Sequence, residues 1–270
     1  MNKNFAVLDY DGYICKAFYA AMAKSGNPDD ALEILERLTE AAITKAVEYY
    51  KDTQVDLRLI LSGHSWKKEL YSDYKKSRDR NPYIGVIRDY AIDKYNNVIK
   101  PETLEADEAC IMCHDFAINN GDSCIIFSDD KDLRYASLVK CKINLTEKIE
   151  TEDDTNYLYC QMLAGDKEDD IQGIYKVGLK TAEKLLNNNY TIDNVIKIYK
   201  DKKVSKEDCI KNINLIIPMK REFNINTCNY DLAGLQMLYN CKSLEHANKS
   251  TCEGQLKFLK QKVNEVYGNE

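Results

Sequence analysis

The chain has 270 residues, 44% of them hydrophobic and 30% charged, with ten cysteines and a formal net charge of −6. No apolar run approaches the roughly 20 residues that span a bilayer, and the N-terminus lacks the long apolar core of a signal peptide. The cysteines have no disulfide-scaffold spacing, and a chain of this length does not need one. We therefore expect a cytoplasmic, globular protein that does not bind membranes. Its size suits one large α/β domain, or one domain with an annex.

The first predicted elements are a strand and two helices. Phe5–Leu8 is a short β-favouring run that ends at Asp9, so the strand places a carboxylate at its C-terminal end, where ligand sites of open α/β sheets lie. Residues 13–23 are predicted to be helical and carry Lys16. Residues 28–51 predict a long amphipathic helix. The predicted buried stripe of that long helix consists of Leu32, Leu35, Leu38, Ala42, Ala46 and Tyr49.

A second buried strand, Leu57–Leu61, is followed by a basic segment that also contains Trp66, Tyr71 and Tyr74. Between residues 65 and 80, three acids are outnumbered by six basic residues: Lys67, Lys68, Lys75, Lys76, Arg78 and Arg80. Cations interleaved with aromatic rings are typical of binding to a strand of nucleic acid, with phosphates on the cations and bases on the rings. A solvated helix whose aromatic side chains pack inward is an equally good interpretation of this segment alone.

Two further helices are predicted, over residues 84–98 and over the segment LEADEACIMCHDFAI that begins at Leu104. The second carries three acids in its first turn, at Glu105, Asp107 and Glu108. Carboxylates there are mildly favoured by the helix dipole, but three in four positions exceed what capping needs. The apolar stripe of this helix comprises Ala106, Ala109, Cys110, Cys113 and Ala117.

The same helix contains Cys110-Ile-Met-Cys113-His114, which formally matches a haem-attachment pattern. We discount that pattern because haem attachment belongs to exported proteins and both cysteines complete a buried stripe. We expect two core cysteines beside a surface histidine. A zinc site is also disfavoured, since no second Cys/His pair has metal-ligand spacing.

Two more strands are predicted, over Cys124–Phe127 and Leu138–Leu145, and the first runs into Ser-Asp-Asp-Lys-Asp. Strands that alternate with helices indicate an α/β fold with a mostly parallel sheet flanked by helices. After about residue 150 only helices are predicted, so we expect residues 1–150 to form one domain and residues 151–270 to form a helical region. The predicted helices of that region are Tyr157–Leu163, Leu179–Leu186, Ile192–Tyr199, Lys206–Ile217 and Leu256–Tyr267.

The loop between the first two of these helices combines acids with glycines. Gly165 is followed by Asp166, Glu168, Asp169 and Asp170, and then by Gly173 and Gly178 before the next helix begins. Glycines before a helix leave backbone N–H groups accessible to an anion such as a phosphate. A solvated acidic turn between two helices is the alternative.

Eight carboxylates therefore occupy positions suited to a common site: Asp9, Glu105, Asp107, Glu108, Asp130, Asp132, Asp166 and Asp169. The first six converge on one edge of a parallel sheet by topology alone, and such a cluster is unfavourable unless cations neutralise it. All-oxygen ligation selects Mg²⁺ or Mn²⁺. Two such ions about 4 Å apart suit phosphodiester hydrolysis. Without these eight acids the net charge of −6 would become +2, so the overall negative charge does not exclude nucleic acid.

The ordered motifs of residues 5–187 resemble those of the 5′-nuclease superfamily, which includes flap endonucleases, phage-type RNase H and the 5′→3′ exonuclease domain of DNA polymerase I. Asp9 matches the first metal aspartate of that family, and Lys16 its basic helix residue. Tyr74, Lys75 and Arg78 match the Tyr-Lys-x-x-Arg of the helical arch. Glu105, Asp107 and Glu108 match Glu-Ala-Asp-Asp, and Asp130 and Asp132 match Gly-Asp-Lys-Asp. The motif Gly-Asp-x-x-Asp-Asn-Ile-x-Gly-Val-x-Gly-Ile-Gly-x-Lys-Thr of the family's helix–three-turn–helix is matched by Asp166, Asp169, Gly173, Gly178 and Lys180.

One departure concerns the second strand, which in the family ends in a metal aspartate. Ser62 takes that position here, and Asp11 or Asp129 are the candidates to supply the missing charge. Without such a substitute, the first metal site is weakened or prefers a different metal.

The resemblance implies a PIN-like nuclease domain with a helical arch, joined to a helix–three-turn–helix at about residues 157–187. It implies a structure-specific 5′ nuclease with two Mg²⁺ or Mn²⁺ ions, which cuts DNA near 5′ ends, nicks or flaps, and RNA in RNA–DNA hybrids. Lys75 and Arg78 would hold the scissile phosphate with help from Lys16. Tyr74, Lys76, Gly173, Gly178 and Lys180 would contact DNA, with K⁺ as a further ion at the helix–three-turn–helix.

As further implications, we expect a monomer that works in replication or repair beside a polymerase or a single-strand-binding protein, in a bacterial or phage-infected cytoplasm. Two alternatives remain. One is a DNA-junction-binding relative that lost its chemistry with the aspartate at Ser62. The other is a small RNA nuclease of the PIN type, which shares the sheet and the acids but lacks the arch and the segment 165–180.

Overall fold

The computed structural model describes residues 3–51, 54–78, 81–101, 104–133, 138–143, 149–152, 155–217 and 247–268. Within these residues the chain divides into two compact units. The first unit contains residues 3–65 and 81–152, and the second contains residues 66–78, 155–217 and 247–268. The short basic segment 66–78 therefore belongs to the helical unit, although both of its flanks along the chain belong to the first unit.

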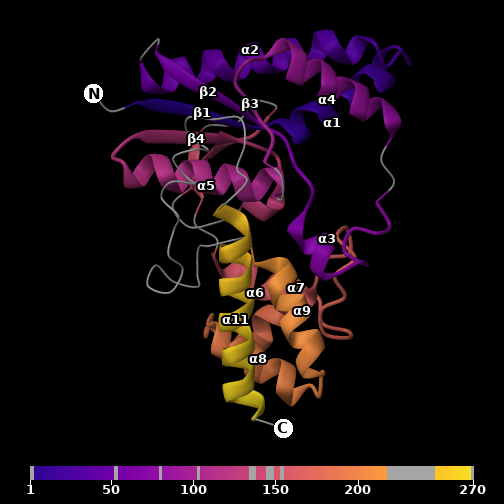
Figure 1. Ribbon diagram of the computed structural model, residues 1–270, viewed down its shortest axis with the longest axis vertical. Coiled ribbons are helices and arrows are strands. Elements are labelled where there is room, and N and C mark those ends of the chain that lie inside the picture. The colour runs from indigo at the N-terminus through magenta and orange to yellow at the C-terminus, as the bar shows by residue number, and fades with distance from the viewer. Residues whose placement is uncertain are drawn as a thin grey trace. The chain divides into compact units, whose positions relative to one another are not determined.

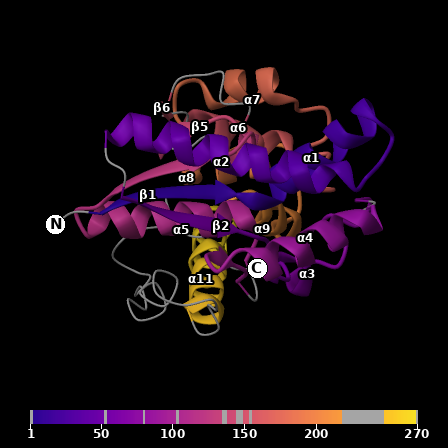
Figure 2. The same cartoon turned by 90° about the horizontal axis from the view of Figure 1, so that it is seen from above.

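The first unit contains one six-stranded sheet with the strand order β3-β2-β1-β4-β5-β6. Strands β1 to β5 are parallel, and β6 joins the edge as an antiparallel strand. Figure 2 shows β6 and β5 on one side of β1 and β2 on the other. The strands are β1 (Asn4–Asp9), β2 (Val55–Ile60), β3 (Val98–Ile99), β4 (Ser123–Phe127), β5 (Leu138–Cys141) and β6 (Glu150–Glu152).

Strand β1 is central because it pairs with β2 on one side and with β4 on the other. Its residue Leu8 is in register with Leu59 and with Phe127, so the three parallel strands end at nearly the same level. The side chains of β1 from Phe5 to Leu8 are buried, as expected for a strand covered on both faces. Residues just beyond these strand ends consequently lie at one edge of the sheet.

Helices cover both faces of this sheet, with α2 and α5 on opposite sides (Figure 1). They are α1 (Tyr10–Lys24), α2 (Asp30–Tyr50), α4 (Pro82–Lys94) and α5 (Ala106–Asn119), and a 3₁₀ turn (Lys131–Leu133) follows β4. Asn81 caps α4, since its side chain accepts a hydrogen bond from the backbone N–H of Tyr83. The core between α1, α2 and the sheet is built from apolar residues such as Leu8, Leu35 and Phe127.

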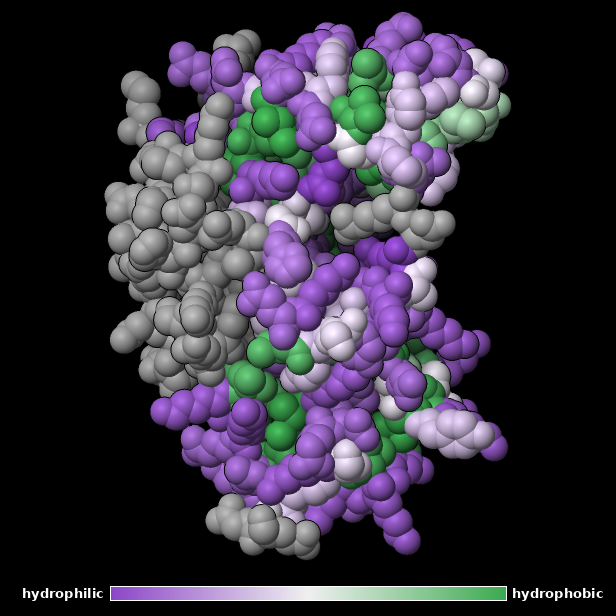
Figure 3. All heavy atoms as spheres, turned by 45° about the vertical axis from the view of Figure 1, so that its right-hand side comes forward, coloured by the Kyte–Doolittle hydropathy of each residue, from purple (hydrophilic) through white to green (hydrophobic). Residues whose placement is uncertain are grey.

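The second unit is helical. Its helices are α3 (Trp66–Leu70), α6 (Thr155–Ala164), α7 (Leu179–Leu186), α8 (Ile192–Asp201), α9 (Lys206–Ile216) and α11 (Ala247–Tyr267). Tyr199 of α8 is buried and its hydroxyl donates to the carbonyl of Met162 in α6 at 2.6 Å. Ser205 and Thr191 cap α9 and α8 through their side-chain oxygens. Figure 3 shows that hydrophilic side chains dominate one face of this unit and of the first, with scattered hydrophobic patches between them.

The predicted α/β fold is confirmed, and several predicted details are wrong. Val98 was expected at the end of a helix, but α4 ends at Lys94 and Val98 begins the short strand β3. Tyr49 was expected in the buried stripe of α2, but it is 49% exposed, and Tyr50 packs against the core instead. Neither β3 nor β6 was predicted. Arg80 and the end of the predicted strand at residues 144–145 lie outside the described residues.

The histidine of the Cys110–His114 pattern is also placed differently from the expectation. His114 is buried rather than on the surface, and its Nδ1 lies 3.3 Å from Asp115. Cys110 and Cys113 are buried free thiols, as predicted, and burial raises the pKa of the Cys113 thiol to about 12. A buried neutral thiol is a poor metal or haem ligand, because the thiolate is the form that binds.

Within the described residues, none of the helices combines the length and the apolar character that crossing a lipid bilayer requires.

Candidate metal and nucleic-acid sites

Three carboxylates of the first unit form a cluster at the edge where the parallel strands end. Asp107 lies in the first turn of α5, and Asp130 and Asp132 follow β4. Each of them offers one carboxylate oxygen, and these oxygens all lie within 4.8 Å of one another. All three side chains are half-buried, so the cluster is open to solvent and to an incoming ion. Oxygen atoms this close repel unless a cation lies among them, which suits a hard divalent ion.

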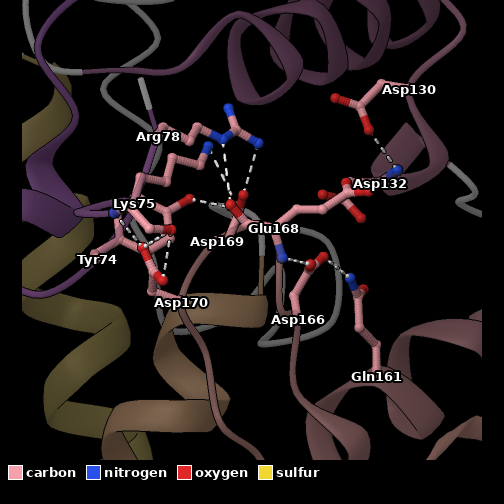
Figure 4. Close-up of polar contacts among 11 residues, drawn as sticks. Tyr74, Lys75, Arg78, Asp130, Asp132, Gln161, Asp166, Glu168, Asp169 and Asp170 are labelled. Carbon is pink, nitrogen blue, oxygen red and sulfur yellow. Dashed lines mark hydrogen bonds and ion pairs between the residues drawn. The ribbon is translucent and has the colours of Figure 1, made fainter. Parts of the chain in front are cut away.

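The loop after β4 is held in place by its own side chains. Ser128 is fully buried, and its hydroxyl oxygen accepts a hydrogen bond from the backbone N–H of Asp130 at 2.9 Å. Asp130 Oδ1 accepts from the backbone N–H of Asp132 at 2.8 Å (Figure 4). Lys140 of β5 donates from its Nζ to the carbonyl of Asp130 at 3.1 Å. These bonds set the direction in which both carboxylates leave the sheet.

Asp9 is a buried carboxyl group whose pKa is influenced by the charge of Asp107 in this cluster. It ends β1, is 6% exposed, and its Oδ2 accepts a hydrogen bond from the Ser128 hydroxyl at 2.7 Å. Burial raises the pKa of Asp9 to about 7, the hydrogen bond from Ser128 opposes the rise, and the charges of Asp11 and Asp107 add to it. A nearby cation would relieve both the desolvation and the repulsion.

The two glutamates of the α5 motif have a structural task. Glu105 and Glu108 form a capping box at the start of the helix, in which Glu108 Oε2 accepts from the backbone N–H of Glu105 at 3.4 Å. Glu108 is fully buried and Glu105 is 6% exposed. Neither belongs to the compact cluster of Asp107, Asp130 and Asp132. Within this sequence motif, Glu105 and Glu108 therefore cap the helix, and Asp107 belongs to the acidic cluster.

Ser62 follows β2, and its side chain joins the same helix start. Its hydroxyl oxygen accepts a hydrogen bond from the backbone N–H of Ala106 at 3.0 Å. The backbone N–H of Ser62 donates to Asp11 Oδ2 at 2.8 Å, and Arg88 Nε lies 3.3 Å from Asp11 Oδ1. Arg88 also donates to the carbonyl oxygen of Ser62. Asp11 is thus occupied by a backbone amide and a guanidinium group.

Asp129, the second candidate for a replacement charge, is occupied as well. Its Oδ2 lies 3.0 Å from Lys16 Nζ, and its Oδ1 accepts from the backbone N–H of Ile143 at 2.9 Å. Lys16, expected to assist at the scissile phosphate, is therefore an ion-pair partner in this structure. Neither Asp11 nor Asp129 is positioned as an uncompensated carboxylate in the place of the missing aspartate.

The acidic loop of the second unit folds back on itself at two glycines. Gly165 has φ of +75° and Gly173 has φ of +62°. A Cβ on Gly165 would lie 2.3 Å from the carbonyl oxygen of Ile171, and a Cβ on Gly173 would lie 2.3 Å from the carbonyl carbon of Ala164. Only glycine fits both the conformation and the contact. Backbone bonds between Asp166 and Ile171, at 2.8 and 2.7 Å, close the turn.

Asp166 and Asp169 are both buried in this turn, at 6% exposure each. Gln161 of α6 donates from Nε2 to Asp166 Oδ2 at 2.9 Å, and the backbone N–H of Glu168 donates to Asp166 Oδ1 at 2.9 Å (Figure 4). Hydrogen bonds to both oxygens fix the rotamer of Asp166. Such fixed carboxylates are suited to hold an ion in a defined geometry.

Asp169 is surrounded by the three residues of the predicted arch motif (Figure 4). Arg78 Nη2 lies 2.7 Å from Asp169 Oδ1, Lys75 Nζ lies 3.4 Å from Oδ2, and the Tyr74 hydroxyl donates to Oδ2 at 3.0 Å. The backbone N–H of Lys75 also donates to the carbonyl of Asp169 at 3.0 Å. Arg78 is 42% exposed, whereas the Lys75 side chain is 9% exposed. The guanidinium group is thus the more accessible of the two cations.

Asp170 is also held by hydrogen bonds within the helical unit. It has φ of +59°, and its carboxylate accepts from the Ser77 hydroxyl and backbone N–H, each at 2.8 Å. These hydrogen bonds from Ser77 lower the pKa of Asp170. Together with the contacts of Asp169, they attach segment 66–78 to the turn 165–171 within the helical unit.

The aromatic residues of segment 66–78 pack inward within this unit. Tyr74 is 2% exposed and Trp66 is 4% exposed, so these rings are not surface platforms for base stacking in this unit. Lys67 is buried too, and its Nζ lies 5.7 Å from the centre of the Tyr74 ring. The exposed cations of the segment are Lys68, Lys76 and Arg78. Tyr74 positions Asp169 instead of presenting its ring.

A groove of about 1190 Å³ lies on the second unit beside these contacts. Its lining comes from segment 73–77, the turn 164–172 and the loop Gly173–Gly178, including the exposed residues Lys76, Lys167 and Lys176. Its two lining acids are occupied, since Asp73 lies 2.5 Å from Lys211 Nζ and Asp170 binds Ser77. Lys180 is exposed in the first turn of α7. Lysines therefore outnumber acids in the lining of the groove.

The structure thus groups the predicted site residues in two clusters, one in each unit, and adds residues that the sequence did not single out. Ser128, Arg88, Gln161 and Ser77 each bind one of the acids discussed above. Gln161 precedes Asp166 by only five residues and lies on helix α6, so this contact is local in the sequence. Arg88 gave no signal, because its partner Asp11 is 77 positions away in the chain.

Comparison with known proteins gives relatives by sequence and by fold. No protein-family model matches the chain. The flap endonuclease Xni of Shewanella denitrificans is 28% identical over 191 residues, which cover 63% of this chain and 74% of that protein. A 5′–3′ exonuclease of Buchnera aphidicola is 26% identical over 263 residues, which cover 87% of this chain and 88% of that protein.

Among solved structures, the bacteriophage T5 D15 flap endonuclease, in a pseudo-enzyme–product complex with DNA and metal ions, has the same fold. The TM-score is 0.60 at 11% identity, over 99% of this chain and 100% of that chain. The sequence motifs, the flap endonuclease and 5′–3′ exonuclease relatives and this shared fold agree, and together they support placing the chain in the 5′-nuclease superfamily.

Proposed function

We propose that this protein is a divalent-metal-dependent, structure-specific 5′ nuclease that hydrolyses phosphodiesters of DNA near 5′ ends or flaps. The observation that carries the proposal is the cluster of Asp107, Asp130 and Asp132 at the edge where the parallel strands end. The relatives are a flap endonuclease and a 5′–3′ exonuclease, and the T5 structure contains DNA and metal ions. A protein that only binds DNA junctions has no need of three carboxylates held within 4.8 Å.

The donor set of the cluster fits Mg²⁺ or Mn²⁺, because it contains only carboxylate oxygens and is open to solvent. We propose Asp107, Asp130 and Asp132 as metal ligands, with Asp9, Glu105 and Glu108 as further acids of the same unit. Asp166 and Asp169 of the helical unit are proposed separately as metal-binding acids. Bound ions of this type lower the pKa of a water and stabilise the charge on the leaving oxygen. Ser128 and the capping box of α5 keep the chain's own carboxylates pointed at that edge.

The cations that would hold the scissile phosphate are Arg78 and Lys75, with Lys16 as a third candidate. Arg78 is the strongest of them, since it is exposed and its guanidinium group can bind two phosphate oxygens at once. Asp169 keeps both cations in a fixed position before DNA binds. Lys16 would have to leave Asp129 in order to contact a phosphate.

The duplex arm of the substrate is proposed to bind the loop from Gly173 to Gly178 and the first turn of α7, where Lys180 is exposed. Gly178 precedes α7 without a capping side chain, so the first N–H groups of the helix are available to a phosphate. Lys76, which lines the groove of the helical unit, adds a second cation. A K⁺ ion at this loop is part of the same proposal.

The proposed substrates are flaps, nicks and other 5′-ended DNA, with RNA in RNA–DNA hybrids as a further substrate. Such an enzyme acts in replication or repair, as a monomer in the cytoplasm of a bacterium or of a phage-infected host. A replicative polymerase or a single-strand-binding protein would be its partner, because each leaves or covers the displaced strand that this nuclease removes.

A cleavage assay tests the proposal on a labelled 5′-flap duplex, a nicked duplex and single-stranded DNA, each with Mg²⁺ or Mn²⁺. We expect cleavage near the flap junction by the natural protein and a loss of about 100-fold or more in Asp130→Ala, because removing a ligand costs several kcal/mol of transition-state stabilisation. Glu48→Ala, which removes an exposed carboxylate from α2, is the matched control and should cleave normally.

Two results would contradict the proposal. Absence of cleavage with both metals, together with tight flap binding, would indicate a binding protein. Equal cleavage by the natural protein and Asp130→Ala would show that the acidic cluster is not the catalytic centre.

A further inference from the structure

Lys176 occupies a backbone conformation that favours glycine. Its φ is +61°, in the left-handed region that a residue with a Cβ adopts only with strain. The motif matched in this loop has glycine at the corresponding position, directly before Ile-Gly, so a lysine is the exception. The neighbouring loop residues Ile174 and Val177 are buried, which fixes the loop and holds Lys176 in this conformation.

The side chain of Lys176 is exposed and has no acidic partner among the residues that the structure describes. Its Nζ lies 5.1 Å from the centre of the Tyr175 ring, and Tyr175 is itself 83% exposed. A cation and an aromatic ring are therefore presented together at the tip of the loop. Neither Tyr175 nor Lys176 contributes to the packing of the loop, because its core is formed by the buried apolar residues.

Lys176 also lines the groove of about 1190 Å³ on the helical unit. Lys76 of segment 66–78 and Lys167 of the acidic turn line the same groove. Of the two acids in the lining, Asp73 is paired with Lys211, and Asp170 keeps its charge while it accepts hydrogen bonds from Ser77. The three lysines therefore outnumber the remaining carboxylate. A groove with this charge is complementary to a chain of phosphates.

We propose that Lys176 is a DNA-binding residue that contacts the phosphate backbone of the duplex arm of the substrate, with Tyr175 packed against the adjoining sugar. This inference rests on the proposed nuclease function and adds a residue to its duplex-binding surface. The loop accepts backbone strain at Lys176 and gains a cation directly beside the N–H groups that precede α7. A lysine at this position therefore lowers the stability of the fold and raises its affinity for DNA.

The test replaces Lys176 by glycine and measures both properties. Because glycine removes the strain, Lys176→Gly should have a melting temperature no lower than that of the natural protein. Its affinity for a blunt DNA duplex should nevertheless fall, and the slope of log Kd against log[NaCl], at a fixed K⁺ concentration, should decrease by about 0.9, the value for one phosphate contact on duplex DNA. Fluorescence anisotropy in EDTA measures binding without cleavage.

Lys203 supplies a matched control, because it is a second exposed lysine of the same unit with φ of +57°. Lys203→Gly should leave duplex affinity and the salt slope unchanged. Lys176→Arg retains the charge and should retain the slope. Tyr175→Ala should weaken duplex binding without changing the slope, since it removes no charge.

The outcomes separate the two proposals. If the natural protein binds no DNA, the proposed function fails. If it binds duplex DNA and Lys176→Gly binds with the same affinity and salt slope, only the role of Lys176 is overturned. The role of Lys176 is equally overturned if Lys203→Gly loses affinity to the same extent, because the effect would then be a general consequence of lost charge.

Discussion

Ser62 follows strand β2 at the position where the family resemblance implies a metal-binding aspartate. The family resemblance places an aspartate there, and the serine hydroxyl still accepts the hydrogen bond from the first N–H of α5. The carboxylates that might replace the lost charge are paired, Asp11 with Arg88 and Asp129 with Lys16. The cluster of Asp107, Asp130 and Asp132 therefore has one carboxylate fewer to share an ion with. We predict that the serine at this position lowers the affinity of the cluster for a divalent ion.

Restoring the carboxylate tests this prediction. In Ser62→Asp the new oxygen can accept from Ala106 as the serine does, and Arg88 lies close enough to limit repulsion from Asp11. We expect the Mg²⁺ concentration for half-maximal cleavage to fall by roughly tenfold, the lower end of the effect of altering groups around a metal. A Mg²⁺ titration of flap cleavage measures it.

Ser62→Asn is the control for this change, because it has nearly the same shape as aspartate and no charge. Its Mg²⁺ requirement should stay at that of the natural protein. An unchanged or higher requirement in Ser62→Asp would mean that the carboxylate count at this edge does not limit metal binding.

Among the elements, the turn from Gly165 to Gly173 is the part whose sequence allows least variation. Its two ends approach so closely that a Cβ at either glycine would lie 2.3 Å from backbone atoms, and backbone atoms cannot move aside as a flexible side chain can. The turn also carries Asp166 and Asp169 and the contacts to segment 66–78. Its geometry therefore sets the position of two acids and two cations together.

Gly173→Ala should destabilise the helical unit by about 2–4 kcal/mol, because it adds a clash to the strain of a left-handed residue. Gly178→Ala is the matched control: it lies in the same loop, at φ of −99°, and its Cβ would meet no atom within 4 Å. Urea unfolding followed by circular dichroism measures both variants. Equal stability of the two would show that the close approach at Gly173 does not exist in solution.

Sequence patterns predicted the longer elements and the order of motifs. They failed where the structure of a segment is determined by contacts with residues far away in the chain. The helix Leu179–Leu186 was predicted to the residue because its apolar spacing and flanking glycine and asparagine are local. The two-residue strand β3 depends on pairing with Leu59 and Ile60, which no local pattern records. The aromatic residues of segment 66–78 were open to two interpretations, and their burial follows from Asp169, which is 95 residues from Tyr74. The ion pair between Arg88 and Asp11 likewise joins residues that are far apart in the chain.

At the scale of the whole molecule, the net charge of −6 and the proposed binding of DNA are reconciled by uneven placement of charge. Acids gather at the end of the parallel strands, where Asp9 is desolvated and its pKa is raised to about 7. Exposed cations gather around the groove of the helical unit. The two surfaces suit opposite ligands, a divalent cation on the first and a phosphate chain on the second. Binding of the cation should also stabilise the fold, because the ion neutralises carboxylates that repel one another only when the chain is folded.

Thermal unfolding with and without Mg²⁺ tests this coupling in the absence of DNA. An ion that binds only the folded chain stabilises it by about 1.4 kcal/mol at a concentration ten times its Kd, which corresponds to a rise of about 2–4 °C in Tm for a protein of this size. Asp130→Ala should show a smaller rise in Tm than the natural protein when Mg²⁺ is added. Its Tm in EDTA combines the removed repulsion with the lost hydrogen bond to Asp132, so the rise on adding Mg²⁺ is the quantity compared. Na⁺ at the same ionic strength controls for screening of surface charge. A rise of equal size with Na⁺, or in Asp130→Ala, would mean that the stabilisation comes from general screening and not from an ion held by Asp107, Asp130 and Asp132.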